Sequence, residues 1–419
     1  MTAPRAEHLM LTRAVLGRSH GVTADPLNGL RWEGIDWDYA VRTADRVGSL
    51  ALLGVALARD GTPRPAEVDR RCRDARIRGA LRALVAERIL SDIEARFSKT
   101  GVEFMVLKGV PLAQELYGEP GLRPMDDLDI LVRRQEREGA LEAMRDLGYR
   151  LPPGSLSQRF YLRHHFHLLM LRQVRTGLPV ELHWNTQPFF STSLIPEDEF
   201  WEGRRTCRVG AVDVTVPGRE QEFLYLIQHL SRHLLGWGPE VAEDPVAVFL
   251  NPARRGRLTW LADLHLLSNA EPLLDREKMA RLAEKWFMSD ELQDALRFIA
   301  GIHTGPGEAG TTPPGQSHRR RSPPAGEWWA SRVPWLANTS DALHFRPILA
   351  FHVLRFAFPG PLLIRHRYGC QGTGRARLAL QTLLHAVEVI LKALRVGGSY
   401  LVEVCLRPFR SRLADRPPS

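Results

Sequence analysis

Residues 122–132 read LRPMDDLDILV, and most of what the sequence predicts about this chain follows from this segment. Its second half is long enough for a strand, and in it apolar residues alternate with Asp127 and Asp129. Because successive side chains of a strand point to opposite faces of a sheet, the two aspartates should project together. Asp126 precedes the strand or alternates onto the apolar face, so it is expected outside the site. The segment therefore predicts a strand with one apolar face and two carboxylates on the other.

An apolar strand is also expected just upstream, where residues 102–107 read VEFMVL. Lys108 and Gly109 follow it, and a proline favours the start of a helix over about 111–117. Glycine lets the backbone approach a ligand closely, and the free N–H groups of a helix start favour a phosphate. This turn is therefore a predicted phosphate site, to which Lys108 and Arg123 would add positive charge.

A third carboxylate comes from residues 180–185, which read VELHWN and place Glu181 and His183 opposite the apolar residues of another strand. Three acids at one sheet surface repel one another unless cations offset the repulsion. Mg²⁺ and Mn²⁺ prefer oxygen ligands, and two such ions about 4 Å apart can promote nucleotidyl transfer. We therefore predict that Asp127, Asp129 and Glu181 are catalytic metal ligands. For His183 we expect a structural hydrogen bond.

The sequence on either side of these strands is helical in pattern. Apolar residues recur at helical spacing before residue 101 and again between about 220 and 301. We predict a helical N-terminal region (1–100), an α/β core (101–216) that ends in a hairpin of strands 166–173 and 180–185, a helical domain (217–303), a flexible linker or loop (304–326), and a basic, partly helical C-terminal region (327–419).

Composition excludes several classes of protein. The 419 residues are 44% hydrophobic and 25% charged, which is ordinary for a globular chain. The four cysteines lie far apart without a CxxC pair, which excludes a disulfide framework and a zinc ribbon. We expect neither a signal peptide nor a transmembrane span, and hence a cytoplasmic protein. The net charge of +9 favours anionic partners, but no stacking aromatics interleave with the basic residues, so nucleic acid is not expected among them.

The segments at 106–109, 122–132 and 180–184 resemble the uncharacterised nucleotidyltransferase family, which belongs to the DNA polymerase β-like nucleotidyltransferase superfamily. The likeness covers about residues 6–300. It implies an α+β fold, with a small mixed β-sheet of nucleotidyltransferase type embedded between helical regions. It also implies an enzyme that binds a nucleoside triphosphate with Mg²⁺ or Mn²⁺, transfers the nucleoside monophosphate to an acceptor hydroxyl and releases pyrophosphate.

The superfamily pattern matches this sequence at four positions of the predicted site. Gly109 matches the glycine of the phosphate-holding turn. Asp127 and Asp129 match the two metal-binding aspartates, and Glu181 matches the third carboxylate. Family members often accompany peptide-modification or polysaccharide gene clusters, which implies an acceptor that is a small molecule, a peptide or a glycan.

One residue departs from this pattern. The superfamily usually has Gly or Ser where this chain has Val110, so phosphate binding is left to backbone groups, Lys108 and Arg123. The departure motivates an alternative hypothesis, in which the protein is a non-catalytic accessory factor that binds a nucleotide or a peptide.

A pair of histidines on a predicted helix has two interpretations. His229 and His233 are four residues apart and could ligate a metal together, but the sequence shows no third ligand. With Arg232, the pair would instead border the nucleotide or acceptor site.

Overall fold

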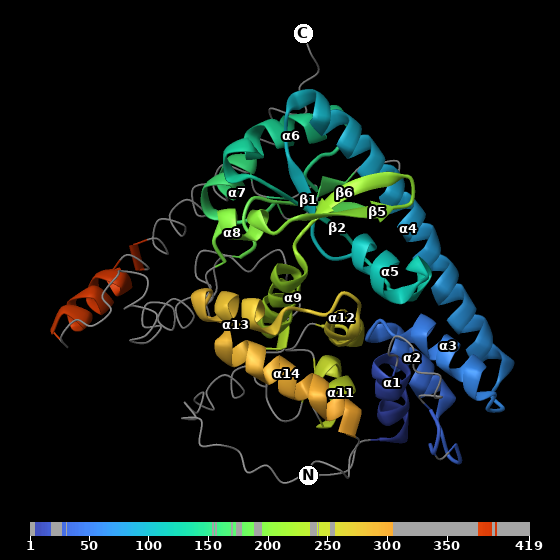
Figure 1. The fold of residues 1–419 in the computed structure, drawn as a ribbon. Coiled ribbons are helices and arrows are strands. Elements are labelled where there is room, and N and C mark those ends of the chain that lie inside the picture. Colours follow the sequence, from blue (N-terminus) through green and yellow to red (C-terminus); the bar gives the residue numbers. More distant parts are fainter. Residues whose placement is uncertain are drawn as a thin grey trace.

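The computed structural model describes residues 5–17, 27–30, 32–152, 155, 157–168, 171–172, 178–187, 195–234, 241, 243–251, 256–304, 376–387 and 390–391 (Figure 1). Its helices are α1 (Ala6–Leu16), α2 (Trp37–Arg46), α3 (Leu50–Asp60), α4 (Ala66–Thr100), α5 (Val110–Tyr117), α6 (Arg137–Asp146), α7 (Gln158–His164), α8 (Glu197–Glu202), α9 (Arg219–Leu234), α11 (Pro245–Leu250), α12 (Leu258–Asn269), α13 (Arg276–Lys285) and α14 (Ser289–Thr304), with short 3-10 helices η1 (Pro120–Leu122) and η2 (Arg134–Glu136).

A four-stranded mixed sheet lies among these helices. Its strands are β1 (Phe104–Val106), β2 (Leu128–Val132), β3 (Leu171–Arg172) and β4 (Pro179–His183), in the order β1-β2-β4-β3. β2 runs antiparallel to β1 and parallel to β4, and β3 is antiparallel to β4. The predicted α+β class, with a small mixed sheet between helical regions, is confirmed.

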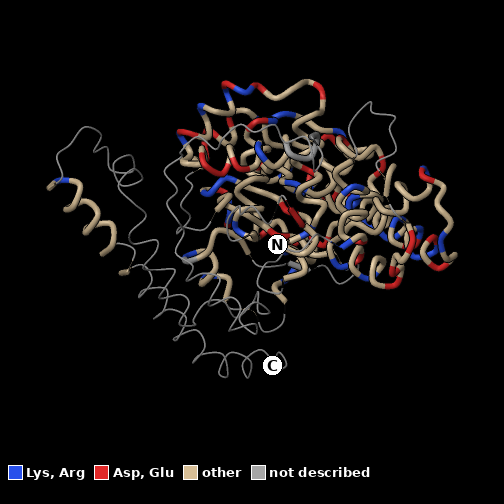
Figure 2. The backbone as a smooth tube through the Cα atoms, turned by 90° about the horizontal axis from the view of Figure 1, so that it is seen from below, with Lys and Arg blue, Asp and Glu red and all other residues tan. Residues whose placement is uncertain are grey.

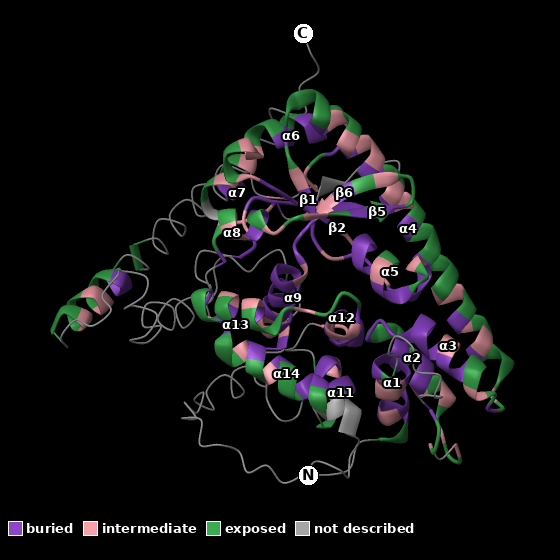
Figure 3. Ribbon diagram, in the orientation of Figure 1, coloured by how far each residue is buried: buried purple, intermediate pink, exposed green. Residues whose placement is uncertain are grey.

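Both faces of the sheet are buried, as Figure 3 shows for the strands. On one face, Ile130 and Leu182 belong to an apolar core that also includes residues of α4 and α6. On the other, Met105 and Leu131 join a core made mainly by helices that precede and follow the sheet in the sequence, such as α1, α3, α9 and α12. Burial stabilises the fold by roughly 25 cal/mol per Å² of apolar surface. Asp129 is two residues before Leu131 on β2 and so shares its face of the sheet. The acid-bearing face is thus turned toward the helices of this second core, α1–α3 and α9–α14, which we call the helical part of the molecule.

Helix α4 links the helical part to the sheet. Val68 and Cys72 near its start pack in the core shared with α3, whereas Ile93 and Phe97 near its end pack in the core of the sheet. The helix ends at Gly101, which caps it in the left-handed conformation with φ 70°. Its 35 residues therefore span both cores.

A second sheet of two strands was not predicted. β5 (Arg205–Val209) and β6 (Val212–Val216) form an antiparallel hairpin. Gly210 adopts φ 56° at its turn. Cys207 and Val214 face inward, and β6 packs close to β1. The predicted hairpin of strands 166–173 and 180–185 is present where it is described: β3 pairs antiparallel with β4. Residues 173–177, between the two strands, lie outside the described residues.

Helix α9 lies at the centre of the helical part. It is buried along nearly its whole length, because α12, α13 and α14 pack around it (Figures 1 and 3). The N-terminal helices α1 and α3 share one apolar core with α9, α12 and α14. In the described structure, helices of residues 1–100 and of residues 217–303 pack together in this core. The division of the chain into these separate regions remains a prediction.

Basic and acidic residues interleave along the described chain (Figure 2), which accords with close pairs such as that of Arg70 with Glu67 and Asp74. Within the described ranges, no helix has both the length and the apolar composition needed to cross a membrane. The predicted linker lies almost wholly outside those ranges, as does most of the C-terminal region, of which residues 376–387 and 390–391 are helical.

Candidate active site

The parallel pairing of β2 with β4 brings the three predicted acids together. Asp129 lies opposite Glu181 in the strand register, and Asp127 immediately precedes β2. One carboxylate oxygen from each of these residues lies within 4.8 Å of those of the other two. Side chains separated by 52 to 54 positions along the chain would not meet without this pairing, so the sheet topology builds the cluster.

Lys108 reaches into the cluster from the end of β1. The backbone N–H of Leu107 donates to the carbonyl of Asp129 at 3.0 Å, which extends the β1–β2 pairing as far as Lys108. The Lys108 ammonium lies 2.5 Å from Asp129 Oδ2 and 3.8 Å from Asp127 Oδ1. In this arrangement the lysine neutralises part of the charge of the acids.

The turn after Lys108 requires a glycine. Gly109 has φ 78° and ψ −121°, a conformation that residues with a Cβ rarely adopt, and it begins α5. The helix starts at Val110, one residue earlier than predicted. The Val110 side chain is buried in the apolar core, so this position offers packing and no hydroxyl.

Burial and the neighbouring charges shift the pKa values of the cluster. Burial raises the pKa of Asp127 to about 6; Lys108 lowers it, whereas Asp129 and Glu181 raise it further. Burial would also raise the pKa of Asp129, but Lys108 and His183 more than offset this effect and hold it below its ordinary value. Burial would lower the pKa of Lys108, yet the carboxylates raise it. Asp127 is therefore the least compensated acid of the site.

Two histidines flank Glu181. His183 Nε2 lies 3.0 Å from Asp129 Oδ1, which is the structural hydrogen bond that we expected, and 3.4 Å from Glu181 Oε2. His167 Nδ1 lies 3.3 Å from Glu181 Oε2. Burial raises the pKa of Glu181, but the neighbouring His167 and His183 rings outweigh burial and hold it well below its ordinary range. His167 was not among the site residues predicted from the sequence, although its place on the predicted hairpin could have suggested it.

Arg123 lies in a buried ion pair with Asp263. Its Nε donates to Oδ1 at 2.8 Å and its Nη2 donates to Oδ2 at 2.7 Å, and the Tyr117 hydroxyl donates to the same Oδ1 at 2.7 Å. Burial would lower the pKa of Arg123, but Asp263 raises it. The guanidinium thus has a partner that the sequence analysis did not anticipate, and Asp127 is close enough to interact with it electrostatically.

Asp126 lies outside the cluster, as expected. Its carboxylate is 59% exposed and pairs with Arg82 at 3.0 Å and with Arg257.

Helix α9 borders the acid cluster on the side of the helical part. Burial raises the pKa of Tyr225, and the charge of Asp129 raises it further. Burial lowers the pKa of Arg232, whereas the charges of Glu181 and Asp129 act to raise it. The buried Nε of Arg232 has no hydrogen-bond partner among the described residues. The ring of His229 makes an edge contact with that of Trp260, with 4.5 Å between centroids.

The prediction of Arg232 beside the site is consistent with this placement. In the part of the chain that the structure describes, His229 and His233 do not belong to a group of metal-ligating side chains.

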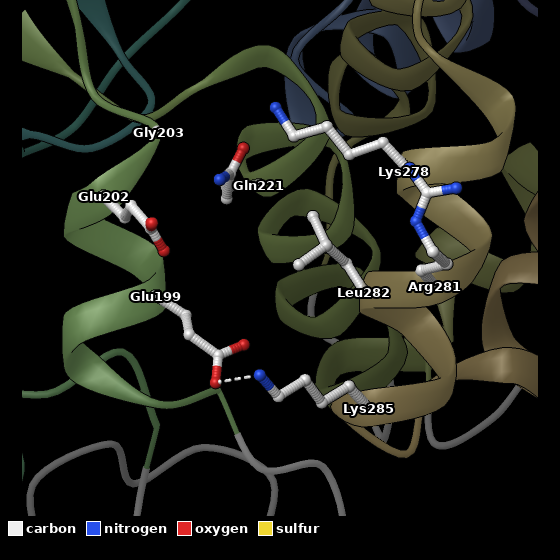
Figure 4. A pocket seen from close by; sticks show the side chains of 8 residues that line it. All are labelled: Glu199, Glu202, Gly203, Gln221, Lys278, Arg281, Leu282 and Lys285. Carbon is white, nitrogen blue, oxygen red and sulfur yellow. Dashed lines mark ion pairs between the residues drawn. The ribbon is translucent and has the colours of Figure 1, made fainter.

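A separate pocket of about 410 Å³ lies among α8, α9 and α13 (Figure 4). Both of its lysines are in ion pairs: Lys285 with Glu199 at 2.7 Å, and Lys278 with Glu220 at 2.9 Å. None of the residues that line it belongs to the acid cluster. We regard it as a groove between ion-paired helices.

Comparison with known proteins identifies the family of this chain. No curated protein sequence matched the chain. A model of one protein family matched residues 33–302, a range that contains the sheet, the acid cluster and the helices around α9. Because this match covers well over half of the sequence, the chain belongs to the uncharacterised nucleotidyltransferase family.

Proposed function

We propose that this protein is a Mg²⁺-dependent nucleotidyltransferase, with Mn²⁺ as the alternative ion. It transfers a nucleoside monophosphate from a nucleoside triphosphate (NTP) to an acceptor hydroxyl and releases pyrophosphate. The observation that carries the proposal is the convergence of Asp127, Asp129 and Glu181 beside a glycine turn. Membership of a nucleotidyltransferase family supports the same general activity. We place the acceptor among the small molecules, peptides and glycans of natural-product or polysaccharide biosynthesis.

The donor set suits a hard divalent ion. Three carboxylates converge here with a single ammonium between them, which leaves negative charge uncompensated. Burial raises the pKa of Asp127, and Asp129 and Glu181 add to this effect. Asp127, Asp129 and Glu181 would hold the ion. When bound, such an ion neutralises the charge that develops on a transferred nucleotidyl group and its leaving group.

The residues around the acids would bind and orient the triphosphate. Lys108 would turn its ammonium from Asp129 toward a β or γ phosphate, and the turn at Gly109 would direct backbone N–H groups at the same anion. Arg123, held by Asp263, and Arg232, with its unpartnered Nε, would add positive charge. Held in this way, the α phosphorus faces the acceptor.

Glu181 would act on the acceptor. Its low pKa keeps it ionised at neutral pH, so it can accept the proton of an acceptor hydroxyl. The acceptor oxygen then bonds to the α phosphorus as the bond to the bridging oxygen breaks, and pyrophosphate leaves with that oxygen.

A second candidate function is that of a non-catalytic accessory protein that binds a nucleotide or a peptide. Two observations favour it: Lys108 is already bonded to Asp129, as if in place of an ion, and a buried Val110 stands where the superfamily usually has Gly or Ser. An accessory protein would bind its partner equally well without the three acids.

Calorimetric binding of the four ribonucleoside triphosphates, with and without Mg²⁺, tests the proposal. We expect wild-type protein to bind one of them only in the presence of Mg²⁺. The double variant Asp127→Asn/Asp129→Asn should lose at least about a hundredfold in affinity, because loss of an outer-shell partner alone costs about 10–100-fold.

The adjacent variant Asp126→Asn is the matched control, since its exposed carboxylate lies outside the cluster and its binding should equal that of wild type. NTP binding that is independent of Mg²⁺ and survives in the double variant would favour the accessory function. Turnover by Asp127→Asn, once an acceptor is known, would refute the catalytic assignment.

A further inference from the structure

The acid cluster continues into a second group of ligands of different chemistry. His167 forms an isolated antiparallel bridge with His183, so the two residues are direct cross-strand neighbours. Two backbone hydrogen bonds hold this pairing: Leu168 N–H donates to Leu182 at 2.9 Å, and Trp184 N–H donates to Phe166 at 3.0 Å. Directly opposed side chains share one face of a sheet. The backbone therefore holds the two imidazoles side by side.

Glu181 lies between these two rings. It precedes His183 by two residues and so shares its face of β4. Its Oε2 lies 3.3 Å from His167 Nδ1 and 3.4 Å from His183 Nε2, and one ligand atom from each of the three residues lies within 4.8 Å of the other two. Ligand atoms about 2.0–2.1 Å from a tetrahedral zinc ion are separated by about 3.3–3.4 Å. Both measured separations from Glu181 match that spacing.

Nδ1 of His167 lacks a hydrogen-bond partner among the described residues. Its Nδ1 is buried, and although it lies close to Glu181 it makes no hydrogen bond. The side chain of His183 is 5% exposed and that of His167 is 12% exposed. A buried polar atom without a partner destabilises the folded state, and a bound ion would remove that cost.

We propose that His167, Glu181 and His183 bind a zinc-type transition-metal ion, in a site distinct from the acid site of Asp127 and Asp129. Imidazole is a ligand that Zn²⁺ and Co²⁺ accept and that Mg²⁺ rarely takes, so the donor set selects the ion. The two sites share Glu181. The ion site does not depend on the proposed transfer reaction.

Titration with Co²⁺ tests this site directly, because four-coordinate Co²⁺ with nitrogen ligands absorbs visible light. We expect wild-type protein to bind one Co²⁺ ion and to show such an absorption band. Zn²⁺ should displace the Co²⁺ ion and abolish the band, whereas excess Mg²⁺ should leave the band unchanged. His167→Gln and His183→Gln should each weaken Co²⁺ binding by at least about a hundredfold, since both remove a direct ligand. Circular dichroism shows whether each variant is folded, and the more exposed His167 is the safer substitution.

Two further variants separate this proposal from the proposed function. Asp127→Asn should lose Mg²⁺-dependent NTP binding but keep the Co²⁺ band, because Asp127 is no ligand of the second site. His165→Gln is the matched control: its ring stacks on that of His167 with 4.6 Å between centroids, but it lies outside the ligand group, so the band should remain. Absence of the band in folded wild type, or an unchanged band in folded His167→Gln, would overturn the site.

Discussion

Two buried groups of charges lie close together in this molecule, and they are built differently. In the first, Asp263 receives hydrogen bonds from Arg123 and Tyr117, so that one anion is matched by one cation and a hydroxyl. In the second, the three acids of β2 and β4 share one lysine and two histidines. Balanced charge of the first kind serves the fold. An uncompensated excess of the second kind is characteristic of a site that receives a cation.

The largest effect should follow from breaking the balanced group. Asp263→Ala leaves the guanidinium of Arg123 buried and unpaired, since both residues are almost fully inaccessible. Removal of one partner of a buried pair typically costs about 3–5 kcal/mol. We expect a loss of that size in the free energy of unfolding, measured by urea denaturation.

The control for this variant is a pair of the same kind at the surface. Asp213→Ala breaks the pair with Arg208, in which both side chains are more than half exposed. Exposed pairs contribute about 0–1 kcal/mol, so this variant should be nearly neutral. Equal losses in the two variants would contradict the structural role of Asp263.

A third charged group lies between these extremes and predicts a pH dependence. Arg205 pairs with both Glu115 and Glu222, and Glu222 is almost completely buried. Burial raises the pKa of Glu222 to about 7, against the attraction of Arg205. Between its ordinary pKa and about 7, the folded state keeps a proton that the unfolded state has released. Stability should therefore fall as the pH rises through this window.

The variant Glu222→Gln should remove most of that fall. With about 1.4 kcal/mol per pKa unit, the free energy of unfolding should drop by about 2–3 kcal/mol less between pH 5 and pH 8 in the variant than in wild type. Urea denaturation at both pH values measures the difference. Glu119→Gln, in an exposed pair with Arg76, is the matched control and should leave the fall unchanged.

The acid site could be predicted from the sequence because local alternation determines it. Period-two spacing indicated which side of each strand carries Asp129 and Glu181, and two such strands in one small sheet must lie near each other. The family resemblance added the fold class. Asp127 and Lys108 needed no further information, because each lies within one or two residues of a strand end.

The balanced group could not be predicted, because its partners are remote in sequence. Arg123 and Asp263 are 140 residues apart, and no periodicity links a residue before β2 to one in α12. Glu119 lies much closer to Arg123 in the sequence, but it pairs with Arg76 at the surface. Tertiary packing decides which charges meet when no shared strand or helix fixes their spacing.

A smaller effect is expected at the turn that supports the acid site. Gly109→Ala introduces a Cβ where φ is 78° and ψ is −121°, although nothing lies within 4 Å of the added atom. Backbone strain of this kind costs about 1–3 kcal/mol. Gly118→Ala at the other end of α5 is the matched control. Gly118 is in the ordinary left-handed region, also with open space, so its cost should be nearer to 1 kcal/mol.

Thermal denaturation and NTP calorimetry on both glycine variants separate strain from function. Only Gly109→Ala should also weaken NTP binding, because only that turn faces the acids. A similar loss of binding in Gly118→Ala would show that α5 acts through its overall stability.

The smallest effect should have the opposite sign. Burial, with the neighbouring Asp129 and Glu181, raises the pKa of Asp127 to about 6, so Asp127→Asn removes a buried charge that destabilises the metal-free protein. This destabilisation develops as the pH rises from the ordinary pKa of Asp127 to about 6 and is complete above it. With solvent screening at a side chain that is 32% exposed, we expect a gain of about 1 kcal/mol at pH 8 and none at pH 4.

Asp129→Asn provides the contrast within the same cluster. Lys108 and His183 both bond to Asp129, so its removal leaves two buried polar groups without their acceptor and should lower stability. Urea denaturation of the metal-free variants measures both signs. If Asp127→Asn also lost stability, its charge would be as well compensated as that of Asp263, and the acid excess would no longer distinguish the site from the fold. A gain in stability together with a loss of Mg²⁺-dependent NTP binding is instead the expected mark of a residue kept for binding at the expense of folding.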